Sequence, residues 1–169
     1  MPATSSSSSN KRPIVSAPTI SGELQISNEA LDRVIATRLA ELSGPIAGAQ
    51  IEALDDDTFT AQLSPRARLL PAVRIVARIE QQPELPDRPR LGLRWSIPGM
   101  GPLGLLAAPV LTFLKALPPG IQADEDRIVV DIGDLLRAQG LDDLLRHVSR
   151  LRVHTRMGAV IVRFDLTVP

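Results

Sequence analysis

Aliphatic and polar residues alternate one by one along several separate segments of this chain. The alternation runs through residues 73–80, 91–97, 127–132 and 151–168. Because successive side chains of a β-strand point to opposite faces of a sheet, this period of two predicts strands with one apolar and one polar face. Such strands are typical of antiparallel sheets that pack one face against a core. The sequence therefore predicts an antiparallel sheet.

The apolar face of this sheet is expected to be almost purely aliphatic. The 169 residues include no tyrosine, and the aromatic residues are Trp95, Phe59, Phe113 and Phe164. Hydrophobic residues make up 44% of the chain, which is ordinary for a globular protein and sufficient for one domain of this length to bury a core. Leu, Ile, Val and Ala therefore supply nearly all of the interior.

The clearest helix is predicted early in the chain. Residues 21–26 form a short strand, and apolar side chains then recur at helical spacing through residues 28–42. Ser27 or Asn28 can cap the first helical turn, and Gly44-Pro45 ends the pattern.

Two further helical regions are expected. Residues 103–117 form an apolar helix that is broken or kinked near Pro109, and residues 134–138 and 141–148 form two short helical segments.

A polar cluster, Asp55-Asp56-Asp57, marks a turn between two strands at residues 51–54 and 58–63.

The predicted order of elements is β-α-β-β-β-β-α-β-α-β-β. This order favours an α+β fold, with a curled antiparallel β-sheet and helices packed on its apolar face. Residues 1–19, which contain the serine run at residues 5–9, are expected to be a disordered polar tail. Residues 20–169 are expected to form a single α+β domain.

One segment is long enough to be tested as a membrane span. Residues 95–114 carry no formal charge, and about 20 apolar residues can cross a bilayer. Pro98, Pro102 and Pro109 interrupt the segment, and its first residues continue a strand pattern. The N-terminus has no apolar signal region. We therefore expect a soluble, cytoplasmic protein without a signal peptide or transmembrane span, which could still associate with a membrane surface.

The sequence offers little for catalysis, metal binding or cofactor binding. It has no cysteine, its two histidines are His147 and His154, and it lacks the G-x-S-x-G and glycine-rich phosphate motifs. The acidic runs at residues 55–57 and 124–126 lack the alternating ligands of a calcium loop. We expect no catalytic residues, no metal and no cofactor, and hence no enzyme.

Arginines gather on the polar face of the predicted sheet. They are Arg74, Arg78, Arg94, Arg152, Arg156 and Arg163. A face of this kind could bind nucleic acid or phosphate, but single-strand binders usually add stacking aromatic residues, which are missing beside these arginines. The formal net charge is zero. Nucleic acid is therefore the third-ranked partner.

The predicted helix at residues 103–117 has more apolar side chains than a helix needs to pack one face on a sheet. A surface helix normally keeps a polar stripe, whereas residues 103–117 are apolar nearly all round. Branched aliphatic side chains without aromatic rings also form a chemically featureless lining, which suits acyl chains better than flat or polar ligands.

The chain resembles the small bacterial members of the tubular lipid-binding (TULIP) superfamily. The resemblance lies in the strand Leu24-Gln25-Ile26-Ser27, the helix that opens Asn28-Glu29-Ala30-Leu31, and the strand at residues 127–132 that leads into a helix and a final hairpin. In that family a curled antiparallel sheet wraps a helix around an apolar groove. The resemblance implies binding of lipid or another apolar ligand and brings no catalytic residues with it.

The leading hypothesis is a non-enzymatic module that binds a lipid-like ligand or a membrane surface between the sheet and the helices. The expected lining residues are Leu31, Ile35, Leu91, Leu93, Leu106, Val110, Phe113, Val160, Val162 and Phe164. The second hypothesis is an assembly subunit that docks on a protein partner through the helix at residues 103–117.

Overall fold

The computed structural model describes residues 18–41, 44–67, 69, 71–99, 120–124, 126–141 and 143–167. The expected apolar helix at residues 103–117 lies outside these residues, and so do the predicted lining residues Leu106, Val110 and Phe113.

Two antiparallel sheets are formed by the described residues. Sheet A has the order β1-β9-β8, and sheet B has the order β2-β3-β4-β5-β7-β6. The strands of sheet A are β1 (Thr19–Ser27), β8 (Val148–Arg156) and β9 (Ala159–Thr167). The strands of sheet B are β2 (Ile46–Ala53), β3 (Thr58–Pro65), β4 (Val73–Gln81), β5 (Arg90–Ser96), β6 (Ile121–Asp124) and β7 (Arg127–Asp131).

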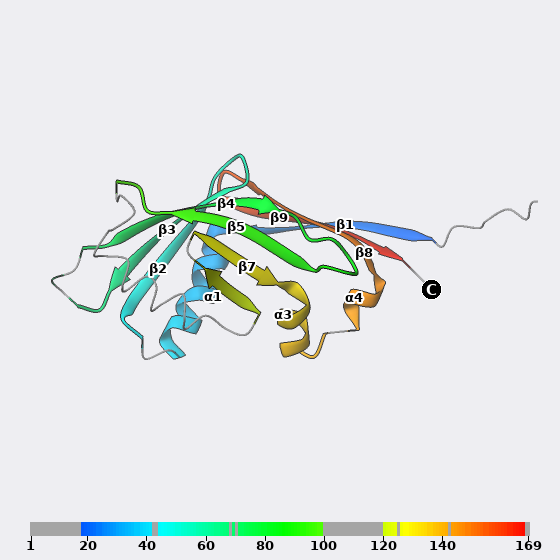
Figure 1. Ribbon diagram of the computed structural model, residues 1–169, viewed down its shortest axis with the longest axis horizontal. Coiled ribbons are helices and arrows are strands. Elements are labelled where there is room, and N and C mark those ends of the chain that lie inside the picture. Colours follow the sequence, from blue (N-terminus) through cyan, green and yellow to red (C-terminus); the bar gives the residue numbers. More distant parts are fainter. Residues whose placement is uncertain are drawn as a thin grey trace, which may run out of the picture.

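The helices lie on one side of these sheets. They are α1 (Asn28–Glu41), α3 (Ile132–Ala138) and α4 (Leu144–His147). Figure 1 shows all of them beneath the curled sheets, with β7 turning down toward α3. We call the sheet face on the helix side the concave face. The predicted α+β class, with helices on one face of a curled antiparallel sheet, is confirmed.

The alternation in the sequence matches the burial of the strands. In β4, Val73, Ile75 and Ile79 are buried, whereas Arg74 and Arg78 are exposed. Most of the buried hydrophobic residues form two clusters on the concave face, while Ile161 is buried on the opposite face of sheet A. The first contains Leu39, Ile46, Leu63, Val73, Ile75 and Trp95. The second contains Ala53, Ile79, Leu91, Val153 and Val160, so it draws on both sheets and helps to hold them together.

Some boundaries differ from the predicted ones. β2 begins at Ile46 rather than at residue 51. Its first four residues, Ile-Ala-Gly-Ala, include no polar side chain, so they show no alternation of apolar and polar residues. β6 was not predicted, because four residues are too few to show an alternation of apolar and polar side chains. Val148 opens β8 instead of ending a helix. The structure therefore contains more sheet than the sequence pattern predicts.

Asp131 ends β7 and starts α3. Its Oδ1 accepts a hydrogen bond from the Asp134 N–H at 3.1 Å, and its Oδ2 lies 3.0 Å from Arg90 Nε. Burial raises the pKa of the Asp131 carboxyl, but the Asp134 and Gly133 N–H groups and the Arg90 guanidinium outweigh it and hold this pKa below its usual range. An N-cap of this kind turns the chain from strand to helix at a fixed residue.

Gly22 in β1 leaves room for an aromatic ring. It pairs with Phe164 of β9, and a Cβ atom at Gly22 would lie 2.5 Å from Phe164 Cζ. The ring therefore lies over the glycine, which is a close contact that no larger residue permits without a shift of the ring.

Gly22→Ala is expected to lower the free energy of unfolding by about 1 to 2 kcal/mol, since the added methyl group displaces the Phe164 ring. Chemical denaturation monitored by circular dichroism measures this change. Gly48→Ala in β2 is the matched control, because no atom lies within 4 Å of its Cβ position. Alanine there should leave stability unchanged or raise it by about 0.4 to 1 kcal/mol. Equal effects of the two substitutions would contradict the ring contact.

Candidate functional site

Five of the seven predicted lining residues that the structure describes come together in the core. Leu31, Leu91, Leu93, Val160 and Val162 all belong to the second hydrophobic cluster, where Leu91 is 9% and Val160 is 7% exposed. These side chains contact one another across the two sheets and α1. A ligand on this face would therefore contact their partly buried members, Leu31, Leu93 and Val162, before the fully buried ones.

The other described lining residues lie apart from this group. Ile35 packs against the first cluster, one turn further along α1 than Leu31. Phe164 lies over Gly22 in sheet A and is half-buried. The described part of the predicted set thus lies in three places: the second cluster, the first cluster and the β1–β9 pair.

Two aliphatic residues of β1 remain uncovered on this face. Leu24 pairs with Val162 and Ile26 with Val160, so the even-numbered residues of β1 share the face that carries the core. Nevertheless, Ile20 is 57% and Leu24 is 53% exposed. An apolar strip therefore continues outward from the core along β1, beside Phe164.

A polar joint that the sequence pattern did not reveal connects the two sheets. The Asp57 carboxylate accepts a hydrogen bond from the Thr155 N–H at 3.1 Å, and the Asp55 carboxylate accepts one from the Met157 N–H at 3.0 Å. The turn predicted at residues 55–57 is confirmed, but its contact with another strand was not predicted. Two of its carboxylates hold the edge of β8.

A glutamine continues the joint along the same edge. Gln82 Nε2 donates to the Val153 carbonyl oxygen at 2.7 Å, and the Val153 N–H donates to Gln82 Oε1 at 2.9 Å. Residues 153, 155 and 157 are two apart, so their N–H groups point to the same side of the strand. Asp55, Asp57 and Gln82 thus replace a neighbouring strand at the free edge of β8. We call this set the inter-sheet joint.

His154 is attached to the joint. Its Nδ1 lies 3.2 Å from Asp57 Oδ1. Within the described residues no hydroxyl group lies within hydrogen-bonding distance of its ring, so this His–Asp pair has no adjacent nucleophile to activate. The pair therefore contributes to the contact between the sheets.

Side chains of α1 accept hydrogen bonds from the free edge of β2, as the inter-sheet joint does at the edge of β8. The Asp32 carboxylate accepts from the Ile51 N–H at 2.7 Å, and Asn28 Oδ1 accepts from the Ala53 N–H at 3.0 Å. Alternate strand residues lie about 6.6 Å apart and helical residues i and i+4 about 6 Å apart, so the spacings match. Side chains of α1 thus satisfy donors that an edge strand would otherwise expose.

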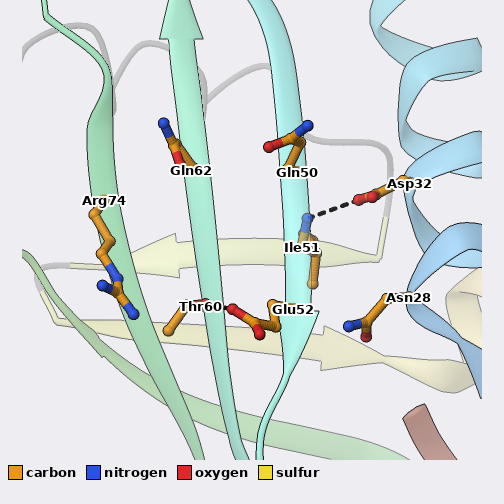
Figure 2. A pocket seen from close by; sticks show the side chains of 8 residues that line it. All are labelled: Asn28, Asp32, Gln50, Ile51, Glu52, Thr60, Gln62 and Arg74. Atoms are coloured by element: carbon orange, nitrogen blue, oxygen red, sulfur yellow. Dashed lines mark hydrogen bonds between the residues drawn. The ribbon is translucent and has the colours of Figure 1, made fainter. Parts of the chain in front are cut away.

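A polar cleft of about 420 Å³ borders this contact. Figure 2 shows Asn28 and Asp32 extending from α1 toward β2, while Gln62 and Arg74 come from the two strands beyond it. Thr60 Oγ1 lies 3.4 Å from Glu52 Oε2. The cleft offers hydrogen-bonding groups but no aromatic platform, and its two residues from α1 are already used to close the strand edge.

The predicted arginine face is partly compensated by carboxylates. Arg94 Nε lies 3.3 Å from both Glu80 and Asp126, and Arg163 Nε lies 2.7 Å from Glu23.

Within the described residues no group of three or more His, Asp or Glu side chains could hold a metal ion. No helix in the described ranges is both long and apolar enough to cross a bilayer. Comparison with protein-family models, curated proteins and solved structures gives no match.

Proposed function

We propose that the chain binds a lipid-like apolar ligand, such as an acyl chain, along the concave face of sheet A. The observation that carries this proposal is the exposure of Ile20 and Leu24, at 57% and 53%, on the same strand face as core residues. A folded domain normally covers aliphatic side chains that continue its core. An uncovered apolar strip on the helix side of a sheet is therefore a surface on which a ligand gains free energy.

The chemistry of the strip favours an acyl chain over a flat or polar ligand. The inward positions of β1 are Ile20, Gly22, Leu24 and Ile26, none of which has a side-chain donor or acceptor. Phe164 borders them from β9. Ile20 and Leu24 are four residues apart on one strand, which separates them by about 13 Å. The strip is therefore narrow and extended, as a hydrocarbon chain is.

A binding titration with a fluorescent long-chain fatty acid tests this proposal. Leu24→Gln is expected to weaken binding about tenfold, which corresponds to a loss of about 1.4 kcal/mol of apolar contact. Met157→Gln is the matched control, because Met157 is also exposed, at 64%, but lies in the β8–β9 turn. Equal affinity of the wild type and Leu24→Gln would rule out this strip as the binding surface.

A further inference from the structure

The face of sheet A opposite the helices carries a second cavity, of about 600 Å³. Four charged side chains lie on this face: Arg150 and Arg152 of β8, Arg163 of β9 and Glu23 of β1. Arg163 pairs with both Arg152 and Glu23, and paired residues point to the same face of a sheet. All four side chains line the cavity. This face points away from Ile20 and Leu24 of the apolar strip, although Gly22 and Phe164 line both the strip and the cavity.

The two carboxylates of the cavity already have partners. Arg163 Nε donates to Glu23 Oε2 at 2.7 Å, and Ser21 Oγ donates to Asp165 Oδ1 at 2.6 Å. Within the described residues, Arg150 and Arg152 have neither a side-chain hydrogen bond nor an ion pair. The guanidinium groups of Arg150 and Arg152 therefore remain available to a ligand, although Asp165 lies opposite Arg150 in the β8–β9 pair.

Arg152 is placed beside a second cation, whose charge is compensated in part by Glu23. It lies directly opposite Arg163 in the β8–β9 ladder, and its side chain is half-buried. Like charges on directly opposed residues of neighbouring strands destabilise a sheet. An anion between the two guanidinium groups would turn this repulsion into attraction.

We propose that this cavity binds a single phosphate group, held by Arg150, Arg152 and Arg163. The planar guanidinium donates paired hydrogen bonds that match phosphate oxygens. Glu23 and Asp165 would repel an extended polyanion, and the rings in the lining are Phe164 and the imidazole of His154, whose Nδ1 lies 3.2 Å from Asp57 Oδ1. A compact phosphate, either free or on a small molecule or lipid headgroup, fits this charge distribution better than a nucleic-acid strand.

Titration of the full chain with inorganic phosphate, followed by NMR chemical shifts, tests the proposal. The wild type is expected to show saturable shifts at residues 150–152 and 163. Arg152→Gln should weaken binding at least tenfold, whereas Arg156→Gln, on the same strand face but outside the cavity, should stay within twofold. Unchanged affinity in Arg152→Gln, or no saturable shift in the wild type, would overturn the proposal.

Thermal unfolding separates a binding role from a structural one. Phosphate should raise the Tm of the wild type and not that of Arg152→Gln, while the variant without phosphate should be at least as stable as the wild type because a repulsion is removed. Vesicles with and without phosphatidic acid then distinguish a lipid headgroup from a free phosphate as the source. Tighter binding of a single-stranded oligonucleotide than of any phosphate monoester would contradict the compact site.

Discussion

Asp57→Ala is expected to lower the free energy of unfolding by about 3 kcal/mol, because hydrogen bonds to charged groups contribute about 1.5 to 3 kcal/mol each. The substitution leaves the Thr155 N–H without its acceptor and removes the partner of His154. For a chain of this length, such a change corresponds to a fall in Tm of roughly 6 to 12 °C. Differential scanning calorimetry measures it directly.

Asp56→Ala supplies a close control for this experiment. Asp56 and Asp57 both have positive φ, at 58° and 57°, so alanine incurs a similar backbone penalty at either position. Of these two residues, Asp57 is the one whose carboxylate bonds to β8 in the described part of the chain. The difference between the two variants therefore isolates the inter-sheet hydrogen bonds, and equal losses of stability would show that the turn itself, not the joint, depends on Asp57.

Asn28→Ala combined with Asp32→Ala is expected to destabilise the chain by about 3 kcal/mol, because it leaves the Ile51 and Ala53 N–H groups unpaired at the edge of β2. An exposed strand edge also offers a template for pairing with another chain. We therefore expect self-association that increases with concentration. Urea denaturation and sedimentation velocity measure the two effects.

The matched double variant is Arg33→Ala with Thr37→Ala. These residues have the same spacing on α1 but are exposed, and within the described residues no hydrogen bond joins either side chain to β2. Their replacement should change the free energy of unfolding by less than about 0.5 kcal/mol and leave the association state the same as that of the wild type. If the Asn28 and Asp32 variant behaves in the same way, α1 does not protect the β2 edge.

The strands with strong alternation could be predicted from the sequence, and the others could not. β4, β5 and the β8–β9 hairpin alternate over several residues, so both their positions and their faces are confirmed. The start of β2 and all of β6 lack such a pattern, because small residues or short length hide it. Pairing with neighbouring strands, which is a long-range interaction, decides the structure of these segments.

The polar contacts between elements could not be predicted by the same means. Asp57 and Thr155 are 98 positions apart, and Gln82 and Val153 are 71 apart. Asp in a turn and Gln after a strand are common in solvated positions, so residue type alone gives no sign of a partner. The one available signal was the positive-φ tendency of consecutive Asp residues, which predicts a tight turn but not what it contacts.

Native mass spectrometry of the full chain, purified without detergent, tests the central claim most directly. If the concave face of sheet A binds a lipid-like ligand, part of the protein should carry an added mass in the lipid range, and mild collisional activation should release it. Leu24→Gln should reduce this bound fraction, and Met157→Gln should not. A single mass that matches the chain alone, both as purified and after incubation with long-chain fatty acid, would contradict the claim.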